Sequence, residues 1–231
     1  MIKAESLKKI YSGATVLDLP ELEIPKGESF GLVGNNGAGK TTFFRLVLDL
    51  IKADEGKIYS KDENVAGNNS WKSYTGSYLD KRFLIDFLTP EEYFNFLGSV
   101  YRLPKGDLER FLESFEEFFN GEVMGKKKYI RDLSSGNQQK VGIASALMLN
   151  PEVLVLDEPF NSLDPTTQIR LKKMLNKFRE ERQVTMLISS HDLNHITEVC
   201  DRICVLEKGK IVHDLPASSD LLKKLEDYFA A

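Results

Sequence analysis

The sequence predicts an α/β protein with a mixed, largely parallel central sheet, an N-terminal antiparallel β part and a small helical insert. Three observations support this fold class. Residues 1–30 alternate short apolar runs with turn signals, which is typical of antiparallel strands. An aromatic-rich stretch with helical periodicity occupies residues 89–120. From residue 136 onward, helices alternate with fully apolar strands, which indicates a parallel sheet covered by helices.

Composition and charge narrow the class of protein. The chain has 231 residues, of which 42% are hydrophobic and 29% charged, as in ordinary globular proteins. The net charge of −4 does not favour a nucleic-acid partner. Cys200 and Cys204 lie in apolar surroundings, so we expect small core residues without a disulfide. Because no apolar run approaches the ~20 residues that cross a bilayer, we expect a cytoplasmic protein whose membrane contact is made only through another chain.

The first elements follow from local pattern. The apolar stretch Ser29–Val33 predicts a buried strand, and apolar residues from Phe43 to Ile51 recur at helical spacing. Residues 56–60 predict a short strand after a turn at Asp54-Glu55-Gly56. Residues 61–77 are polar and rich in Asn, Ser and Gly, so we expect mostly loop.

A helical insert is expected in the middle of the chain. Thr89 has the character of an N-cap, followed by proline at the first helical position and acids in the first turn. Farther on, apolar residues share one helical face and predict the core of this insert, whose exposed face could dock a partner. They are Leu108, Phe111, Leu112, Phe115 and Phe119.

The second half of the chain continues the α/β alternation. We expect helices at about 136–149, 165–182 and 192–200, with strands at 153–157 and 184–189. A hairpin is predicted around Glu207-Lys208-Gly209. Residues 219–229 predict a short amphipathic helix.

Residues 34–41 match the pattern G-x-x-x-x-G-K-[ST] without interruption. The glycines let the backbone wrap closely, so that several N–H groups can point at one anion. The following helix adds the positive end of its dipole. In this motif Lys40 reaches the β- and γ-phosphates, and the Thr41 hydroxyl ligates Mg²⁺. The candidate phosphate-binding residues are Asn35, Asn36, Gly37, Ala38, Gly39, Lys40, Thr41 and Thr42.

Two acids follow the apolar strand Val153–Leu156. The carboxyl end of such a strand lies at the edge of an α/β sheet where ligands bind. We expect Asp157 to be a Mg²⁺ ligand and Glu158 to be the general base that activates a water. His191 follows another apolar strand, where it could contact a γ-phosphate.

These motifs together resemble the ATP-binding cassette (ABC) family, the ATPase subunits of ABC transporters. Residues 34–41 resemble its Walker A motif, a P-loop, and Val153–Glu158 its Walker B motif. Leu133–Asn137 is similar to the signature motif, Ser162–Asp164 to the D-loop and His191 to the switch histidine. Tyr11 stands where the family places an aromatic residue that stacks on adenine.

The resemblance implies a single ABC domain over residues 1–231, a P-loop NTPase fold with a helical subdomain inserted at about 80–150. It implies ATP and Mg²⁺ as cofactors, and ATP hydrolysis that powers transport across a membrane. The partners would be a membrane-spanning permease and a second ABC ATPase subunit, which places the chain at the inner face of the cell membrane. Ser134, Gly136 and Asn137 would contact the nucleotide of the opposing subunit in an ATP-driven dimer. The resemblance leaves open the cargo, the direction of transport and the identity of the second ATPase subunit.

The sequence departs from the family pattern at two places. The signature carries Ser135 for the usual glycine and Asn137 for the usual glutamine. Either the phosphate contact across the dimer is weakened, or the partner subunit compensates. The glutamine of the family's Q-loop is replaced by Asp80 or Lys81, and the sequence does not choose between them. An ammonium has no acceptor for a metal-bound water.

Two other classes remain open. A soluble ABC-type ATPase of translation or DNA repair usually carries two cassettes or long coiled-coil insertions, and neither is found in this chain. A non-catalytic subunit that binds ATP as a structural switch fits the altered signature but not Glu158.

Overall fold

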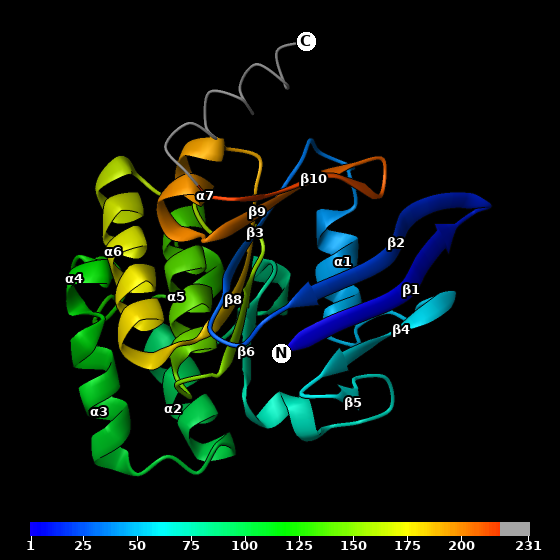
Figure 1. The fold of residues 1–231 in the computed structure, drawn as a ribbon. Coiled ribbons are helices and arrows are strands. Elements are labelled where there is room, and N and C mark those ends of the chain that lie inside the picture. The colour runs from blue at the N-terminus through cyan, green and yellow to red at the C-terminus, as the bar shows by residue number, and fades with distance from the viewer. Residues whose placement is uncertain (218–231) are drawn as a thin grey trace.

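Two sheets organise the part of the chain that the structure, a computed structural model, describes, residues 1–217 (Figure 1). The first sheet has strand order β2-β1-β4-β5, and its strands pair antiparallel. The second has order β10-β9-β3-β8-β7-β6, in which all pairings are parallel except that of β10 with β9. The predicted antiparallel N-terminal sheet and largely parallel central sheet are therefore confirmed.

The strands have the following bounds: β1 Ile2–Tyr11, β2 Ala14–Ile24, β3 Ser29–Val33, β4 Glu55–Ser60, β5 Glu63–Asn64, β6 Thr75–Tyr78, β7 Val153–Leu156, β8 Thr185–Ser190, β9 Arg202–Glu207 and β10 Lys210–Pro216. The helices are α1 Lys40–Val47, α2 Pro90–Val100, α3 Lys105–Ser114, α4 Glu116–Phe119, α5 Ser135–Leu147, α6 Pro165–Arg182 and α7 Leu193–Val199. Short 3-10 turns lie at Ser70–Ser73, Lys81–Phe83 and Ile130–Asp132. None of the helices within residues 1–217 combines the length and apolarity needed to cross a bilayer.

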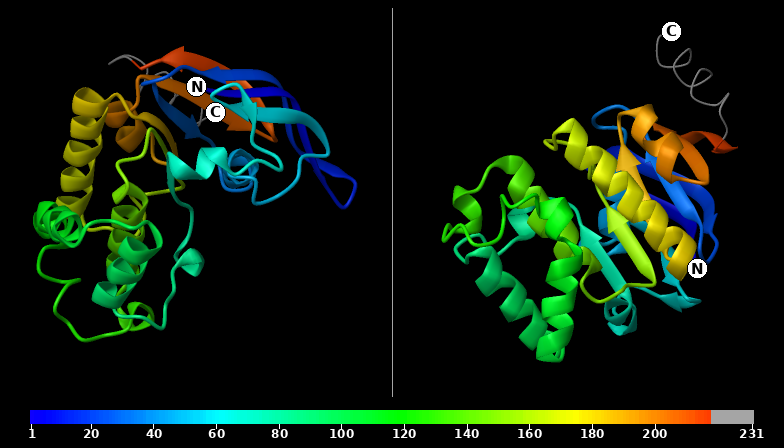
Figure 2. Two further views of the ribbon diagram at one scale, coloured as in Figure 1. Left: turned by 90° about the horizontal axis from the view of Figure 1, so that it is seen from below. Right: turned by 90° about the vertical axis from the view of Figure 1, so that its left-hand side faces the viewer.

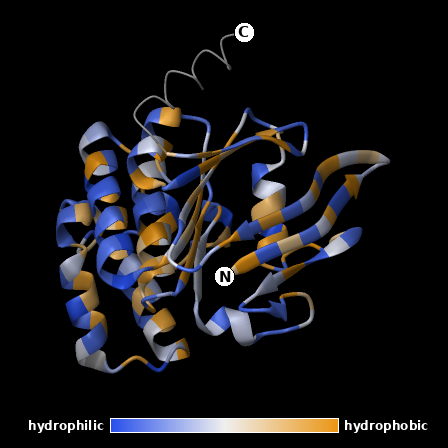
Figure 3. Cartoon of the chain, viewed as in Figure 1, coloured by the Kyte–Doolittle hydropathy of each residue, from blue (hydrophilic) through white to orange (hydrophobic). Residues whose placement is uncertain are grey.

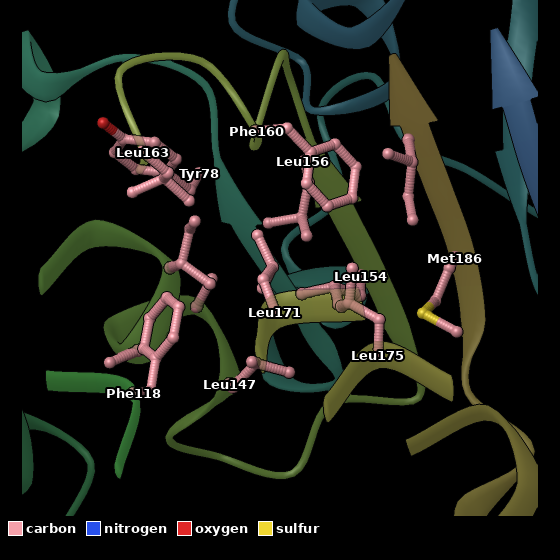
Figure 4. Close-up of a cluster of buried hydrophobic side chains, with 14 of the residues drawn as sticks. Tyr78, Phe118, Leu147, Leu154, Leu156, Phe160, Leu163, Leu171, Leu175 and Met186 are labelled. Atoms are coloured by element: carbon pink, nitrogen blue, oxygen red, sulfur yellow. The ribbon is translucent and has the colours of Figure 1, made fainter. Parts of the chain in front are cut away.

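Both faces of the central sheet are covered, which explains why its strands are apolar along their whole length. In β7, Val153 and Val155 point into one buried cluster, with α1 and the antiparallel sheet. Leu154 and Leu156 point into the other, with residues of α5, α6 and α7. Figure 4 shows this second cluster, in which Leu171 and Leu175 of α6 lie over the strands. The hydropathy colouring shows polar residues on the outward faces of the helices (Figure 3).

The helices between β6 and β7 gather at one end of the molecule, away from the N-terminal strands (Figure 2). Helix α2 begins with a capping box: Thr89 Oγ1 accepts from Glu92 N–H at 3.2 Å, and Glu92 accepts from Thr89 N–H at 2.8 Å. Phe94, Phe115 and Phe119 are buried at the centre of this group. The Phe119 ring centroid lies 6.0 Å from that of Phe94 and 5.9 Å from that of Phe115, and the rings of both pairs are tilted to each other, by 45° and 38°.

The expected loop over residues 61–77 was wrong at its end, because β6 begins at Thr75 and pairs in parallel with β7. Gly76 gave the false loop signal. A Cβ at this position would stand 1.8 Å from the Ala146 carbonyl oxygen, so the glycine permits α5 to pass close over the strand. The helical spacing predicted from Phe43 to Ile51 is confirmed only as far as Val47, where α1 ends. The other strands and helices predicted within the described residues are confirmed to within about two residues. The predicted helix at 219–229 lies outside the described residues.

Parallel pairing brings the carboxyl ends of β3, β6, β7 and β8 to one edge of the sheet. The chain leaves β3 into the glycine-rich loop, β7 into Asp157 and Glu158, and β8 into His191. Residues more than a hundred positions apart therefore meet at this edge.

Candidate functional site

The loop after β3 ends in a helix N-terminus without a side-chain cap for its first N–H groups. Gly39 is the N-cap of α1, and no side chain caps the helix or places an acid in its first turn. Gly39 has φ 112°, a left-handed conformation that disfavours other residues. The free N–H groups and the helix dipole make this end a site for an anion.

A pocket of about 210 Å³ lies over this helix end. All the loop residues predicted to bind phosphate line it, and Val16 of β2 and Glu158 complete its wall. The lining consists of Val16, Asn35, Asn36, Gly37, Ala38, Gly39, Lys40, Thr41, Thr42 and Glu158.

Lys40 is the cation of this pocket. Its side chain is only 6% exposed, and Nζ donates to the Gly34 carbonyl oxygen at 2.5 Å. The same nitrogen lies 3.2 Å from Glu158 Oε1, so the two charges offset each other. A buried ammonium with only these two acceptors can exchange them for phosphate oxygens with little movement.

Asp157 lies beside Thr41 although 116 positions separate them in the chain. Thr41 Oγ1 donates to Asp157 Oδ2 at 2.5 Å, and Ser189 Oγ donates to Asp157 Oδ1. Burial raises the pKa of the Asp157 carboxyl, and the Glu158 charge acts in the same direction, while the hydrogen bonds from Ser189 and Thr41 oppose this. A hydroxyl and a carboxylate side by side are the oxygen donors that Mg²⁺ prefers.

Glu158 contacts His191 at the mouth of the site. His191 Nδ1 lies 2.9 Å from Glu158 Oε2, and the His191 N–H donates to the same oxygen at 3.3 Å. Glu158 itself has φ 49°, which is uncommon for a residue with a side chain. The Glu158 N–H donates to Ser189 Oγ at 2.9 Å.

Other predicted residues lie outside the pocket lining. Tyr11 is 43% exposed, and Lys9 Nζ lies 5.1 Å from its ring centroid. The signature residues Ser134, Gly136 and Asn137 form the start of α5, where Ser134 Oγ accepts from the Asn137 N–H at 3.3 Å. Within one chain, neither group lines the phosphate pocket.

Asp80 and Lys81, the two candidates for the position of the Q-loop glutamine, contact different partners. Asp80 caps the 3-10 turn after β6 and pairs with Arg82, whose Nε lies 2.9 Å from Asp80 Oδ1. Lys81 is exposed, and its Nζ lies 3.5 Å from Ser135 Oγ at the start of α5. Neither side chain lines the phosphate pocket.

Sequence reasoning missed Val16 and Ser189. Val16 gave no signal, because it contributes to the pocket wall only through the placement of β2 against the loop. Ser189 did give a signal: two hydroxyls, those of Ser189 and Ser190, follow the apolar residues of β8 directly before His191.

Comparison with known proteins places the chain in a family. Residues 17–161 match the family described as ABC transporter. The ABC transporter ATP-binding protein YhaQ of Bacillus subtilis is 35% identical over 212 residues, which is 92% of this chain and 70% of that protein. The bacitracin transport ATP-binding protein BcrA of Enterococcus faecalis is 34% identical, over 99% of this chain and 73% of its own length.

Solved structures agree with these relatives. The dimeric post-hydrolysis state of the ATP-binding cassette MJ0796, bound to ADP and Pi, superposes with a TM-score of 0.84 at 25% identity, over 95% of this chain and 100% of that one. The matched family segment contains the phosphate-binding loop, the signature and the two acids after β7. The chain therefore belongs to the ABC transporter family, as an ATP-binding subunit of its ATPase type.

Proposed function

We propose that this ABC ATPase subunit binds Mg²⁺ and ATP in the pocket over α1 and hydrolyses the nucleotide with Glu158 as general base. One observation carries the proposal: Lys40 and Glu158, which follow two different strands, line the same small pocket, and Asp157 accepts a hydrogen bond from Thr41 in that lining. In this assignment Asn36 to Thr42 surround the phosphates with backbone N–H groups, and Lys40 supplies the main positive charge.

Thr41 and Asp157 are the residues that would hold Mg²⁺. The donor set fits a hard cation, and the remaining coordination positions suit water and phosphate oxygens. A bound Mg²⁺ supplies charge neutralisation for the phosphates during transfer. Asp157 has to be ionised for this role, and its raised pKa disfavours that ionised form.

Glu158 and His191 would share the attacking water. Glu158 forms an ion pair with Lys40, and a phosphate that binds Lys40 would release the carboxylate to accept a proton from water. His191, 2.9 Å from the other carboxylate oxygen, is placed to orient Glu158 and to contact the γ-phosphate.

The signature residues would serve a second subunit. Ser134 is exposed, Gly136 and Asn137 are half-buried, and all three lie outside the pocket of their own chain. A solved relative, MJ0796, is dimeric. A head-to-tail dimer, in which two nucleotides lie between the subunits, would give these residues a phosphate in trans, with Tyr11 stacked on adenine.

A permease would dock beside the turn after β6. A hollow of about 160 Å³ lies there, lined by apolar residues of the sheet edge and of α2, including Leu79, Leu84 and Tyr93. Phe83 and Phe87 on the same segment are 55% and 60% exposed. Exposed aromatic side chains beside an apolar hollow are typical of protein contact sites. This docking would place the subunit, with its helical subdomain over about residues 80–150, at the inner face of the membrane, with the permease selecting the cargo.

The general-base assignment is tested by Glu158→Gln. This variant is expected to keep ATP affinity, to lose about 10²–10⁴-fold in ATPase rate, and to accumulate an ATP-bound dimer in sedimentation velocity. Glu152→Gln is the matched control, because Glu152 directly precedes the first residue of β7, at the end of the strand opposite to Glu158. This variant should keep the parent rate. An ATPase rate in Glu158→Gln equal to that of the parent would exclude the role of Glu158. A parent chain that binds ATP but never turns it over, with or without a membrane subunit, would favour a non-catalytic switch.

A further inference from the structure

The turn that carries Glu158 is held in a conformation that its own sequence does not favour. Glu158 has φ 49°, and Ser162 in the same segment has φ 59°; neither is a glycine. Left-handed backbone at such residues is costly and persists where the surroundings impose it. The groups that impose it here decide where the carboxylate points.

The peptide groups of Glu158 are restrained from two sides. Its N–H donates to Ser189 Oγ at 2.9 Å, from the end of β8. Its carbonyl oxygen accepts from Gln139 Nε2 at 3.2 Å. Gln139 Nε2 also donates to the next carbonyl, that of Pro159, at 2.5 Å. A primary amide has two N–H donors, so one side chain satisfies both carbonyls of this turn.

Gln139 is well placed to hold the turn rigidly. It lies on α5, one turn after the signature residues, and is only 7% exposed. The same helix contacts the segment again at Gly136, where a Cβ would stand 2.5 Å from the Ser162 carbonyl oxygen. The start of α5 therefore packs directly on the segment that follows β7.

We propose that Gln139 is a positioning residue for hydrolysis, which fixes the general base Glu158 through the backbone carbonyls of Glu158 and Pro159. This inference rests on the proposed role of Glu158. Gln139 does not line the phosphate pocket, so its replacement should leave nucleotide binding unchanged. The Glu158 carboxylate, however, would no longer be held in the orientation that hydrolysis requires. The signature residues begin the same helix, α5. Contact of the signature with the nucleotide of the opposite subunit would therefore affect, through Gln139, the position of Glu158 in its own subunit.

The test compares three variants. Gln139→Met keeps the size of the side chain and removes both donors. Its kcat should fall by roughly 10-fold to 100-fold, the effect of a small misplacement of a reacting group, while its affinity for Mg²⁺·ADP stays within about twofold of the parent. Gln168→Met is the matched control, because Gln168 Nε2 donates at 3.0 Å to the carbonyl of Phe160, one residue beyond Pro159. Its kcat should equal that of the parent.

Gln139→Glu adds a readout that general destabilisation does not produce. An ionised carboxylate facing two carbonyls has no donor, whereas the protonated acid offers one O–H. Burial beside acceptors favours the protonated form. The ratio of its kcat to that of the parent should therefore rise as the pH is lowered from about 8 to about 6, whereas that of Gln139→Met should stay flat. If Gln139→Met does not fold, as judged by circular dichroism, this ratio carries the test.

The outcomes distinguish the positioning role of Gln139 from the general-base role of Glu158. A parent-like kcat in Gln139→Met, or equal losses in Gln139→Met and Gln168→Met, overturns the positioning role. A pH-independent ratio for Gln139→Glu overturns it as well. A parent-like kcat in Glu158→Gln, measured in the same series, instead overturns the general-base assignment.

Discussion

At the scale of single residues, burial sets the behaviour of the site. Asp157 is 6% exposed, and its carboxylate accepts from the Thr41 and Ser189 hydroxyls while Lys40 and Glu158 stand nearby. Burial raises its pKa above the ordinary ~3.9 of an unfolded chain. A carboxyl whose pKa is higher in the folded state favours folding most when it is protonated. The ionised form therefore lowers the stability of the nucleotide-free protein.

Asp157→Asn should relieve this cost. At pH 7 the variant without nucleotide is expected to unfold at a higher temperature than the parent, by roughly 2–4 °C for each kcal/mol gained in a chain of this size. The gain in melting temperature should vanish at a pH below the pKa values of Asp157 in both the folded and the unfolded chain, because the parent carboxyl is protonated there too. Thermal unfolding followed by circular dichroism checks this, with Asp86→Asn, at an exposed carboxylate, as the control. Addition of Mg²⁺ and ATP should stabilise the parent but not Asp157→Asn, and a lower melting temperature for the variant at pH 7 would contradict the argument.

At the scale of elements, local pattern predicted those parts whose signal lies within a few residues. The capping box at Thr89 and the apolar run of β7 are of this kind. Strand β6 was missed because its pairing with β7 and the passage of α5 over Gly76 are tertiary facts. The sequence signalled a hydroxyl near the end of β8, but the contacts of Ser189 and Gln139 with the Glu158 turn could not be predicted from it, because they depend on how β8 and α5 lie against β7.

Helix α5 is also tied to the preceding segment by an ion pair. Lys140 is 2% exposed, and its Nζ lies 2.8 Å from Glu122 Oε2, while the Glu122 side chain is half exposed. The hydrogen bond and the charge of Lys140 lower the pKa of the Glu122 carboxyl. The contribution of the Glu122 carboxylate to stability is therefore fully present at a pH above its unfolded-state pKa of ~4.3. It is lost as the pH falls through the lower pKa of the folded state.

Glu122→Gln should destabilise the chain by about 1–3 kcal/mol at pH 7. The removal of one partner of a fully buried pair costs about 3–5 kcal/mol, and the exposure of Glu122 reduces this. Urea unfolding at pH 7 and at pH 3 measures the difference, which should shrink at the lower pH. Glu117→Gln is the control, because Glu117 is 83% exposed beside Arg170 and exposed pairs contribute little. Equal effects of the two substitutions would show that Lys140 does not need its partner.

At the scale of the whole molecule, one chain presents two incomplete halves of a nucleotide site. The pocket over α1 is lined by Lys40, Thr41 and Glu158, with Asp157 hydrogen-bonded to Thr41, but its lining includes no residue of α5. The start of α5 is a second helix N-terminus, and its first residues are exposed. A head-to-tail pair of chains would bring each half to the other and would make association depend on the nucleotide. The family fold, the phosphate loop and the expected pairing in trans could be predicted from the sequence and its resemblance to the family, whereas the position of the start of α5 outside the pocket of its own chain depends on the fold.

The departures of the signature from the family pattern should therefore limit dimerisation. Ser135 adds a Cβ and a hydroxyl to the exposed start of α5, with Lys81 Nζ 3.5 Å from that hydroxyl, and Asn137 reaches one methylene less than glutamine. Ser135→Gly combined with Asn137→Gln, in a Glu158→Gln background that retains ATP, is expected to tighten the dimer by about tenfold, which corresponds to about 1.4 kcal/mol. Sedimentation velocity with Mg²⁺ and ATP measures this. Asn95→Gln on the exposed face of α2 is the control and should leave the dimer unchanged. The tightening should be absent with ADP, because the proposed contact is to the γ-phosphate, and a weaker dimer with ATP would show that Ser135 and Asn137 do not limit the contact across the interface.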